Sequence, residues 1–212
     1  MDIHRPKHKL ESLREFAVEL FTVTCGIIIA LSLEAGVTYW HERILAREAR
    51  TDFRAELAEN EDKLAKFVAA DAALEVWFDS MIDFAHARLA HQAAKPPGDP
   101  PPRTFLHLEQ AAWDTALATQ AIRLLGFQET RALAALYNRQ AAVNALTVTA
   151  IDQWISVSGY DPDEAMSDEE GRQALKQLRV AKVYAQSLTH TDAEILAQSK
   201  AASALLGGRV DP

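Results

Sequence analysis

Residues 16–40 read FAVELFTVTCGIIIALSLEAGVTYW, a run of 25 mostly apolar residues interrupted only by Glu19 and Glu34. As a helix, this run reaches about 37 Å, enough to cross a hydrocarbon core of about 30 Å. The charge-free part from Leu20 to Leu33 reaches only about 21 Å, so the two glutamates would lie near the membrane rims. We predict a transmembrane helix over 16–40; the alternative is a buried helix of a soluble protein.

The residues around this segment favour insertion in a membrane. Tyr39 and Trp40 form an aromatic pair of the kind found where a span meets the lipid headgroups. Leu33 and Ala35 make a poor signal-peptidase site, so the helix is expected to stay attached as an anchor. Basic residues lie on both sides of the segment: Arg5, Lys7, Lys9, Arg14 and Arg43.

The orientation of the span is not decided by its flanking charges alone. Four Lys or Arg residues precede it, and Arg43, Arg47, Arg50 and Arg54 follow it. The free amino terminus adds one positive charge to the short N-terminal tail, and positive charge favours the cytoplasmic side. We therefore expect a cytoplasmic N-terminus and a C-terminal domain on the outer, periplasmic side.

Polar and small residues of the span are candidates for contacts with lipid or another subunit. Glu19 and Glu34 lie about 60° apart around an ideal helix and so share a face. Carboxylates at membrane depth are costly without a partner, which suggests an ion path or a subunit contact, whereas near the rims they reach the headgroups. Close helix packing is also possible through small-residue pairs. The predicted contact residues are Glu19, Gly26, Ala30, Glu34, Gly36, Tyr39 and Trp40.

The composition favours a helical protein that does not bind nucleic acid. Of 212 residues, 49% are hydrophobic and 25% charged, which is ordinary for a folded chain and fits one domain plus an anchor. Only eight glycines and eight prolines occur, so long stretches lack helix breakers. The net charge of −8 opposes phosphate binding, and the single Cys25 excludes an intrachain disulfide.

Residues 41–94 contain neither proline nor glycine, which predicts one long helix that continues from the span, or two helices nearly in line. One face is apolar: Phe53, Leu57, Leu64, Phe67, Val68, Leu74, Phe78, Met81, Ile82 and Ala85. The opposite face is expected to be solvated and carries Arg50, Arg54, Glu59, Glu61, Lys63 and Lys66. Asp71 is the weakest position for helix continuity.

The chain beyond this helix predicts further helices separated by loops. A stiff connection is expected at the prolines of 95–103, and one or two helices at 104–125. A long helix follows over 128–157. Capping boxes at Ser167–Glu170 and Thr191–Glu194 predict two more helix starts, the last helix ending at the glycine pair after Leu206.

These elements predict an all-α fold with an antiparallel bundle of about four helices, since short loops place consecutive helices antiparallel. Trp77, Trp113 and Trp154 are expected at its centre. The predicted organisation is a basic tail at 1–15, a transmembrane helix at 16–40, a long helix at 41–94, a proline-rich loop at 95–103, the remainder of the bundle at 104–206 and a tail at 207–212.

The sequence offers no set of residues typical of catalysis or metal binding. His86 and His91 diverge by about 140° on a helix, and no Glu-x-x-His pair occurs. Asp161, Asp163 and Asp168 resemble the start of a calcium loop, but the later ligand positions are missing. Nucleophile-elbow and phosphate-binding motifs are absent from the sequence. We expect a non-enzymatic protein without a cofactor.

Two stretches carry a resemblance to a known group of proteins. REFAVE at 14–19, GIIIAL at 26–31 and HER at 41–43 resemble the anchor of a family of bacterial inner-membrane proteins that has only a domain-of-unknown-function label. WDTALATQAIRLL at 113–125, with residues 133–137, is similar to the soluble signature of that family, although Gln120 stands where a small residue is expected. The resemblance implies a bacterial, single-span helical protein and supplies no catalytic residues.

Three functional hypotheses follow. The first is an envelope protein that packs against itself or against a larger membrane complex. The second is a small-molecule sensor with a pocket between helices near Trp113, Tyr137 and Trp154. The third is an ion-conducting oligomer that uses Glu19 and Glu34.

Overall fold

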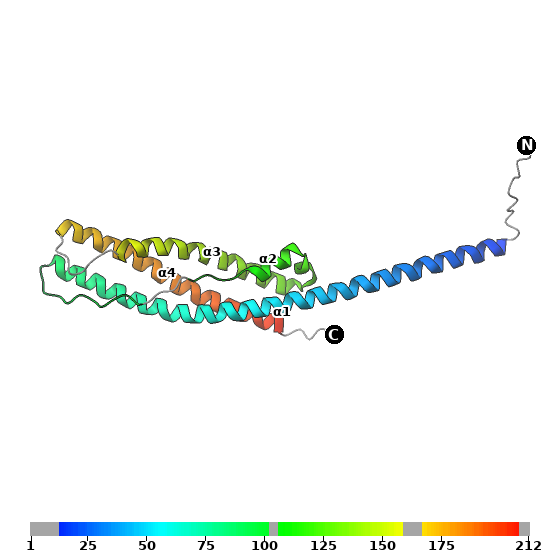
Figure 1. The fold of residues 1–212 in the computed structure, drawn as a ribbon, viewed down its shortest axis with the longest axis horizontal. Coiled ribbons are helices and arrows are strands. Elements are labelled where there is room, and N and C mark those ends of the chain that lie inside the picture. Colours follow the sequence, from blue (N-terminus) through cyan, green and yellow to red (C-terminus); the bar gives the residue numbers. More distant parts are fainter. Residues whose placement is uncertain (1–12, 102–105, 159–166, 208–212) are drawn as a thin grey trace, which may run out of the picture. The chain divides into compact units, whose positions relative to one another are not determined.

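A computed structural model describes residues 13–101, 106–158 and 167–207 of the chain, and these ranges contain helices without any strand. The prediction of an all-α protein is therefore confirmed. The elements shown in Figure 1 are α1 (Leu13–Leu89), α2 (Ala111–Ala118), the 3-10 helix η1 (Ala121–Leu124), α3 (Phe127–Ser158) and α4 (Asp168–Gly207). The basic residues before position 13 and the acidic stretch at 161–163 lie outside the described residues.

The chain divides into two compact units, residues 1–47 and residues 48–212, which we describe separately. The first unit contains the early part of α1, with the predicted membrane span. The second unit contains the rest of α1 and all other elements. The boundary lies within α1, seven residues beyond Trp40.

The core of the second unit is a three-helix bundle with a heptad pattern. In each of α1, α3 and α4, a series of buried positions recurs in steps of three, four or seven residues, a repeat that averages 3.5 and favours left-handed supercoiling. The series is, in α1, Arg50, Phe53, Leu57, Asn60, Leu64, Asp71, Leu74, Phe78, Met81 and Ala85; in α3, Glu129, Leu133, Leu136, Gln140, Val143, Thr147, Ala150 and Val157; and in α4, Ala174, Leu178, Ala181, Ala185, Leu188, Asp192, Ile195, Ser199, Ala202 and Leu206. Ala49, Phe84, Tyr137 and Leu175 are also buried, next to this series.

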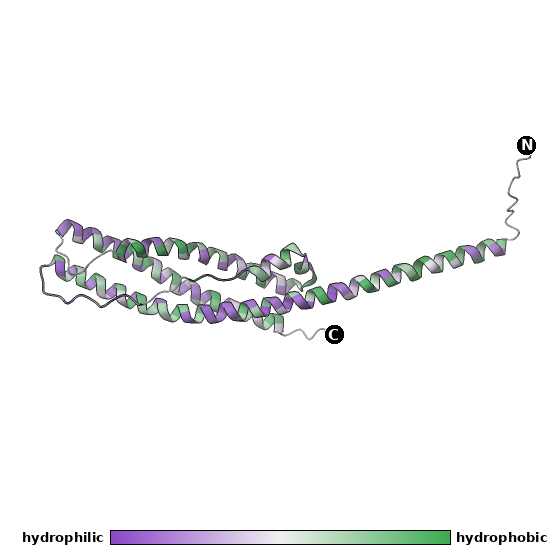
Figure 2. Cartoon of the chain, viewed as in Figure 1, coloured by the Kyte–Doolittle hydropathy of each residue, from purple (hydrophilic) through white to green (hydrophobic). Residues whose placement is uncertain are grey.

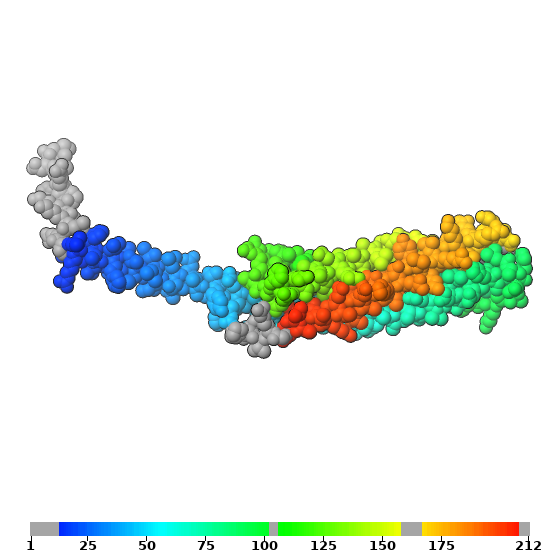
Figure 3. Space-filling model, turned by 180° about the vertical axis from the view of Figure 1, so that it is seen from behind, coloured from blue at the N-terminus to red at the C-terminus, as the bar shows by residue number. Residues whose placement is uncertain are grey.

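Contacts at successive levels establish the direction of α4. Arg54 donates to the carbonyl oxygen of Leu206 near one end, and the Arg179 guanidinium meets the His86 ring, 2.9 Å away, near the other. Residue numbers therefore rise along α1 as they fall along α4, so the two helices are antiparallel. Figure 3 shows α4, in orange and red, lying alongside α1 and α3.

The direction of α3 differs from the predicted up-and-down order. Arg50 pairs with Glu129, and 27 residues later along α1 the Trp77 ring lies 5.6 Å from that of Trp154. Residue numbers thus increase in the same direction along α1 and α3, so the two helices are parallel. A short loop cannot join two parallel helices of this length, because the chain must first return to the starting end.

The return is made by the segment between α1 and α2, at which a short connecting loop was expected. Trp77 donates to the carbonyl oxygen of Gly98 at 2.7 Å, and Asn60 contacts Glu109. The two α1 positions are separated by about 26 Å of helix, whereas a helix over residues 98–109 would span only about 17 Å. Residues 92–101 accordingly form no helix, as expected from the prolines among them.

Two asparagines clamp the end of this segment against the bundle. Asn60 of α1 exchanges two hydrogen bonds with the backbone of Glu109, at 2.9 and 3.0 Å. Asn144 of α3 does the same with the backbone of Leu108, at 3.1 Å in both directions. Each amide supplies the donor and acceptor that a neighbouring strand would supply. Leu108 can therefore be fully buried without leaving backbone groups unsatisfied.

Two expectations about individual residues were wrong. Arg50 was expected on the solvated face but is only 7% exposed. Thr191 was expected to begin a new helix, but its hydroxyl donates to the carbonyl oxygen of Ser187 at 2.6 Å within an unbroken α4. Threonine favours helix ends, but here the other contacts of α4 maintain the helix around it. The helix α1 continues through Asp71, so this part of the chain is one helix rather than two in line.

The aromatic centre of the bundle also differs from expectation. Trp77, Trp113 and Trp154 are only partly buried, at the edges of the core. The largest fully buried side chains include Tyr137, Phe53 and Phe78. Full burial of one such side chain contributes about 1.5–3 kcal/mol. The indole rings need a polar neighbour for their N–H groups, as Trp77 has in Gly98, and this requirement favours the edge.

Candidate functional site

The early part of α1 is long and apolar enough to cross a membrane, and it is the one such helix among the described residues. Figure 2 shows hydrophobic residues all along it. Its large apolar side chains are exposed rather than packed: Leu13, Phe16, Val18, Leu20, Phe21, Val23, Ile27, Ile28, Ile29, Leu31, Leu33 and Val37. This unit therefore contains no protein surface that would shield them from water.

Hydroxyl groups within this apolar part are satisfied inside the helix itself. The hydroxyl groups of Thr22, Thr24 and Ser32 donate to carbonyl oxygens four residues earlier, at 2.9, 2.7 and 2.7 Å. In a hydrocarbon environment an unsatisfied polar group is costly, and internal bonds of this kind remove the cost. The hydroxyl groups of Thr22, Thr24 and Ser32 therefore do not interrupt the apolar surface between Glu19 and Glu34.

The predicted contact residues of the span all lie on its surface. Glu19, Ala30, Glu34, Tyr39 and Trp40 are exposed. At Gly26 and Gly36, a methyl group in place of the hydrogen would meet no atom within 4 Å. The guanidinium of Arg43 lies 5.7 Å from the centre of the Tyr39 ring, a cation–π arrangement at the end of the segment. Space for a second helix or for lipid therefore exists around both glycines.

The second unit gathers aromatic and acidic groups near the start of α2. The rings of Trp113 and Tyr137 stack with centres 5.4 Å apart. The Tyr137 hydroxyl donates to Glu56 at 2.6 Å, and the other Glu56 oxygen accepts from the backbone N–H of Ala112 at 2.8 Å. Burial, together with this bond and the nearby negative charge, raises the pKa of Tyr137. Glu56 therefore ties α1, α2 and α3 together.

Trp154 does not belong to this group. It packs against Trp77 and Phe78, with ring centres 5.6 and 5.5 Å away. Because Tyr137 and Trp154 are 17 residues apart on α3, they are separated by about 26 Å. The structure thus brings Trp113 and Tyr137 together and places Trp154 elsewhere, so the three residues do not line one ligand pocket.

A buried ion pair lies at the end of the bundle where α1 enters it. Arg50 Nε and Nη2 donate to the two carboxylate oxygens of Glu129, both at 3.2 Å, and Glu129 also accepts from the backbone N–H of Gly126 at 2.6 Å. Glu129 is only 4% exposed. The pair fixes the turn before α3 against α1, and a buried charge that loses its partner is strongly destabilising.

Sequence reasoning missed the polar residues inside the core. Asn60, Gln140 and Ser199 are fully buried, and Asp71, Thr147 and Asp192 are at most 4% exposed. All six lie at heptad core positions, where polar residues specify register at a cost in stability. The available signal was their spacing. Each lies four or seven residues from an apolar core residue, so a search of the sequence for a 3.5-residue repeat would have placed them in the core.

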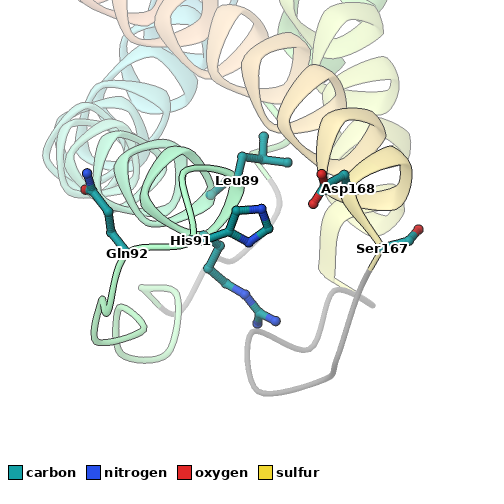
Figure 4. Close-up of a pocket in the computed structure, with 8 residues that line it drawn as sticks. Leu89, His91, Gln92, Ser167 and Asp168 are labelled. Atoms are coloured by element: carbon teal, nitrogen blue, oxygen red, sulfur yellow. The ribbon is translucent and has the colours of Figure 1, made fainter.

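The opposite end of the bundle contains a cavity of about 370 Å³ between the end of α1 and the start of α4. Figure 4 shows Leu89 and His91 from the α1 side and Asp168 from the α4 side around it. His91 adopts a left-handed backbone conformation with φ of 55°. The predicted capping box is confirmed nearby: Ser167 N–H and Oγ donate to Glu170 at 2.8 and 2.7 Å.

Within the described ranges, no three His, Cys, Asp or Glu residues are grouped so as to hold a metal ion. Several acidic and basic side chains there pair with one another instead, as Lys63 does with Glu59 of its own helix and with Glu109 of the segment before α2. Burial lowers the pKa of Lys63, but the hydrogen bonds to these two carboxylates outweigh this effect and raise it. Comparisons with protein-family models, curated proteins and solved structures gave no match.

Proposed function

We propose that this protein is a membrane-anchored interaction subunit whose helical bundle works by packing rather than by catalysis. The observation that carries the proposal is the set of large apolar side chains exposed along residues 13–40 beside a bundle with its own complete core. In a lipid bilayer the apolar side chains of such a helix can stay exposed without packing against other protein.

The proposal includes a location. The segments at 14–19, 26–31 and 113–125 resemble a family of bacterial inner-membrane proteins, which supports a single span in that membrane. The proposal places residues 1–15, which carry Arg5, Lys7, Lys9 and Arg14, on the cytoplasmic side and the bundle in the periplasm. Protease protection in inverted vesicles tests this orientation: a bundle sealed inside the vesicles supports it, and a digested bundle contradicts it.

A packing role is supported by the use of the polar groups in the bundle. Glu56, Asn60, Glu129 and Asn144 all hold segments of the chain together. Polar groups fixed in this way favour a rigid scaffold over a reactive site. The partners that suit the protein are lipid, a second copy or a larger membrane complex, rather than nucleic acid.

The test of anchoring compares two substitutions at positions of similar exposure. Ile28→Arg places a charge in the middle of the span, and Val148→Arg places it on the bundle surface; these side chains are 56% and 62% exposed. An arginine at the centre of a span costs about 2.5–3.5 kcal/mol. We expect Ile28→Arg to weaken retention in membranes washed with alkaline carbonate and Val148→Arg to leave it unchanged. Recovery of the unmodified protein in the supernatant would contradict the proposal.

The interaction role needs its own test. A photoreactive amino acid placed at exposed positions of the bundle, in intact membranes, is expected to give discrete protein adducts. A purified protein that is monomeric in detergent and gives no adduct from any position would exclude a packing subunit, even if the anchor is correct.

A further inference from the structure

Two aspartates lie deep inside the bundle, one on α1 and one on α4. Asp71 is fully buried and Asp192 is only 1% exposed. Both occupy core positions of the heptad series, where apolar residues are usual. A carboxylate at such a position loses its hydration, which is costly. Burial of both groups therefore needs a source of compensation.

The two aspartates lie at about the same level of the bundle. The Thr189 hydroxyl of α4 donates to Glu75 of α1 at 2.6 Å. Asp71 comes four residues before Glu75, and Asp192 comes three residues after Thr189. Because α1 and α4 are antiparallel, both steps lead in the same direction along the bundle, and they differ by about 1.5 Å. The axes of packed helices are about 8–10 Å apart, so two carboxyl groups buried between them at one level are close together.

The third helix adds a hydroxyl group to this level rather than a charge. Asp71 comes six residues before Trp77, and Thr147 comes seven residues before Trp154, whose ring packs on that of Trp77. Thr147 is 4% exposed, and its hydroxyl oxygen has no hydrogen-bond partner among the described residues. This hydroxyl group is therefore available to donate to a carboxylate of the same layer.

The titratable groups next to this layer come from every element packed around it. They are Lys66 and Glu75 on α1, His190 and Glu194 on α4, Arg139 and Asp152 on α3, and Asp99, His107 and Glu109 in residues 98–101 and 106–109 of the segment between α1 and α2. Lys66 binds Asp62, and both His190 and Arg139 bind Glu194. Asp99, His107 and Asp152 are exposed. The cations of the three helices next to the layer are thus engaged with other carboxylates.

Two carboxylates in one buried layer repel each other, and removal from water also favours the uncharged form of each. One proton held by the pair relieves both effects, and two such acids then titrate as a unit. A metal ion would need more ligands, but the described residues show no group of three His, Cys, Asp or Glu side chains that could hold one. We infer that Asp71 and Asp192 share one proton at neutral pH and release it to solvent as the pH rises, which weakens the contact between α1 and α4. The inference goes beyond the proposed function and does not depend on the anchoring.

The layer borders the apolar core of the far end, the end at which α1 stops and α4 begins. This core cluster draws on residues 74–85 of α1 and 175–185 of α4, and Leu74 is only three residues beyond Asp71. A second negative charge at the border of the cluster favours the entry of water. The far end is therefore the part of the bundle that loosens when the proton is released.

Infrared spectroscopy of the full chain in detergent detects the proton directly. We expect a C=O stretching band of a protonated carboxylic acid at neutral pH, which disappears as the pH rises. Asp71→Asn combined with Asp192→Asn should remove the band, whereas Asp83→Asn, at an exposed position of α1, should leave it. Carbon-13 labelling of aspartate shifts the band and so assigns it to aspartate even if the double variant fails to fold. Absence of such an aspartate band at neutral pH, or its persistence in the folded double variant, would overturn the inference.

Urea unfolding measured against pH gives the second test. The unfolded chain releases the proton at about pH 4, as an exposed aspartate does. The pair therefore contributes stability that is fully present below about pH 4 and is lost as the pH rises through the range in which the folded pair ionises. In that range the equilibrium constant for unfolding should rise by up to about tenfold per pH unit relative to the double variant, which contains the same histidines, and Asp83→Asn should keep this slope. Equal slopes for the unmodified protein and the double variant, or an opposite difference, would contradict the shared proton.

Discussion

The two parts of α1 arrange their apolar and polar side chains in opposite ways. Before residue 48, the apolar side chains point outward and the hydroxyl groups bond back to their own helix, as Thr24 does with Leu20. After residue 48, the apolar side chains point inward, and polar groups such as Glu56 and Asn60 bond to other elements. One helix thus shows the pattern suited to lipid and then the pattern suited to water.

The comparison teaches that the surroundings, rather than helix propensity, decide where a side chain points. Ala, Leu and Glu occur in both parts, and both are helical. What changes is the repeat: the later part places its apolar residues on a 3.5-residue stripe, whereas the earlier part is apolar all round. Substitutions matched between the two parts should therefore have very different effects on the bundle.

The largest difference is expected for phenylalanine. Phe53→Ala empties a fully buried position and should lower the free energy of unfolding of the bundle by about 3–5 kcal/mol. Phe21→Ala, at a side chain that is 69% exposed, should leave it unchanged. Urea unfolding of the full chain in detergent, followed by circular dichroism, measures both. Equal losses for the two variants would mean that the units unfold as one.

The buried ion pair should show the next largest effect. Glu129→Gln leaves the Arg50 charge buried without its counter-ion, and we expect a loss of about 3 kcal/mol in the same unfolding measurement. Glu34→Gln in the span removes a carboxylate at an exposed position and should not alter bundle unfolding. A loss for Glu129→Gln below about 0.5 kcal/mol, the range of surface substitutions, would show that the pair is dispensable.

A single hydroxyl group offers a smaller test. Tyr137→Phe removes the 2.6 Å hydrogen bond to Glu56 and should cost about 2 kcal/mol, because the acceptor is a partly buried carboxylate. Tyr39→Phe is the control in the first unit. The tyrosine absorbance adds a second readout: since the pKa of Tyr137 is raised, this residue should ionise only at a pH above the ordinary tyrosine range. Ionisation of Tyr137 at the ordinary pH would contradict the described burial.

The smallest effect is a pH dependence at the far end. Hydrogen bonds from the side chain and backbone of Ser167 lower the pKa of Glu170 below its ordinary value of 4.5. The folded state thus gains stability that is fully present above pH 4.5 and is lost as the pH falls through the lowered pKa. Glu170→Gln should flatten the pH dependence of unfolding below pH 4.5, whereas Ser32→Ala should not. An unchanged profile would mean that the capping box is not maintained in solution.

The helical content and the apolar span were predictable because they depend on local patterns. An apolar run of 25 residues and a Ser-x-x-Glu box are read directly from the sequence, and Ser167 begins α4 as expected. The start of α3 after Gly126 was likewise visible. These features need no knowledge of what lies across the bundle.

The topology and the interior polar residues were not predictable in the same way. The parallel order of α1 and α3 depends on the contacts of Gly98 and Glu109 with positions far back in the chain. Arg50 looked like a surface charge because its partner Glu129 is 79 residues away. The pocket expected near Trp113, Tyr137 and Trp154 is absent for a related reason. Tyr137 and Trp154 belong to the same helix, but they lie at different heights along it.

The contact between Arg54 and Leu206 has a consequence for biosynthesis, because it joins positions 152 residues apart. At about 5–20 residues per second, the ribosome needs roughly 8–30 seconds to make the intervening chain. Throughout this interval the apolar stripe of α1 is not yet covered by α4. The α1–α3 pair, which Asn60 and Asn144 join through the backbone of residues 108–109, is an earlier long-range assembly that can protect the nascent polypeptide.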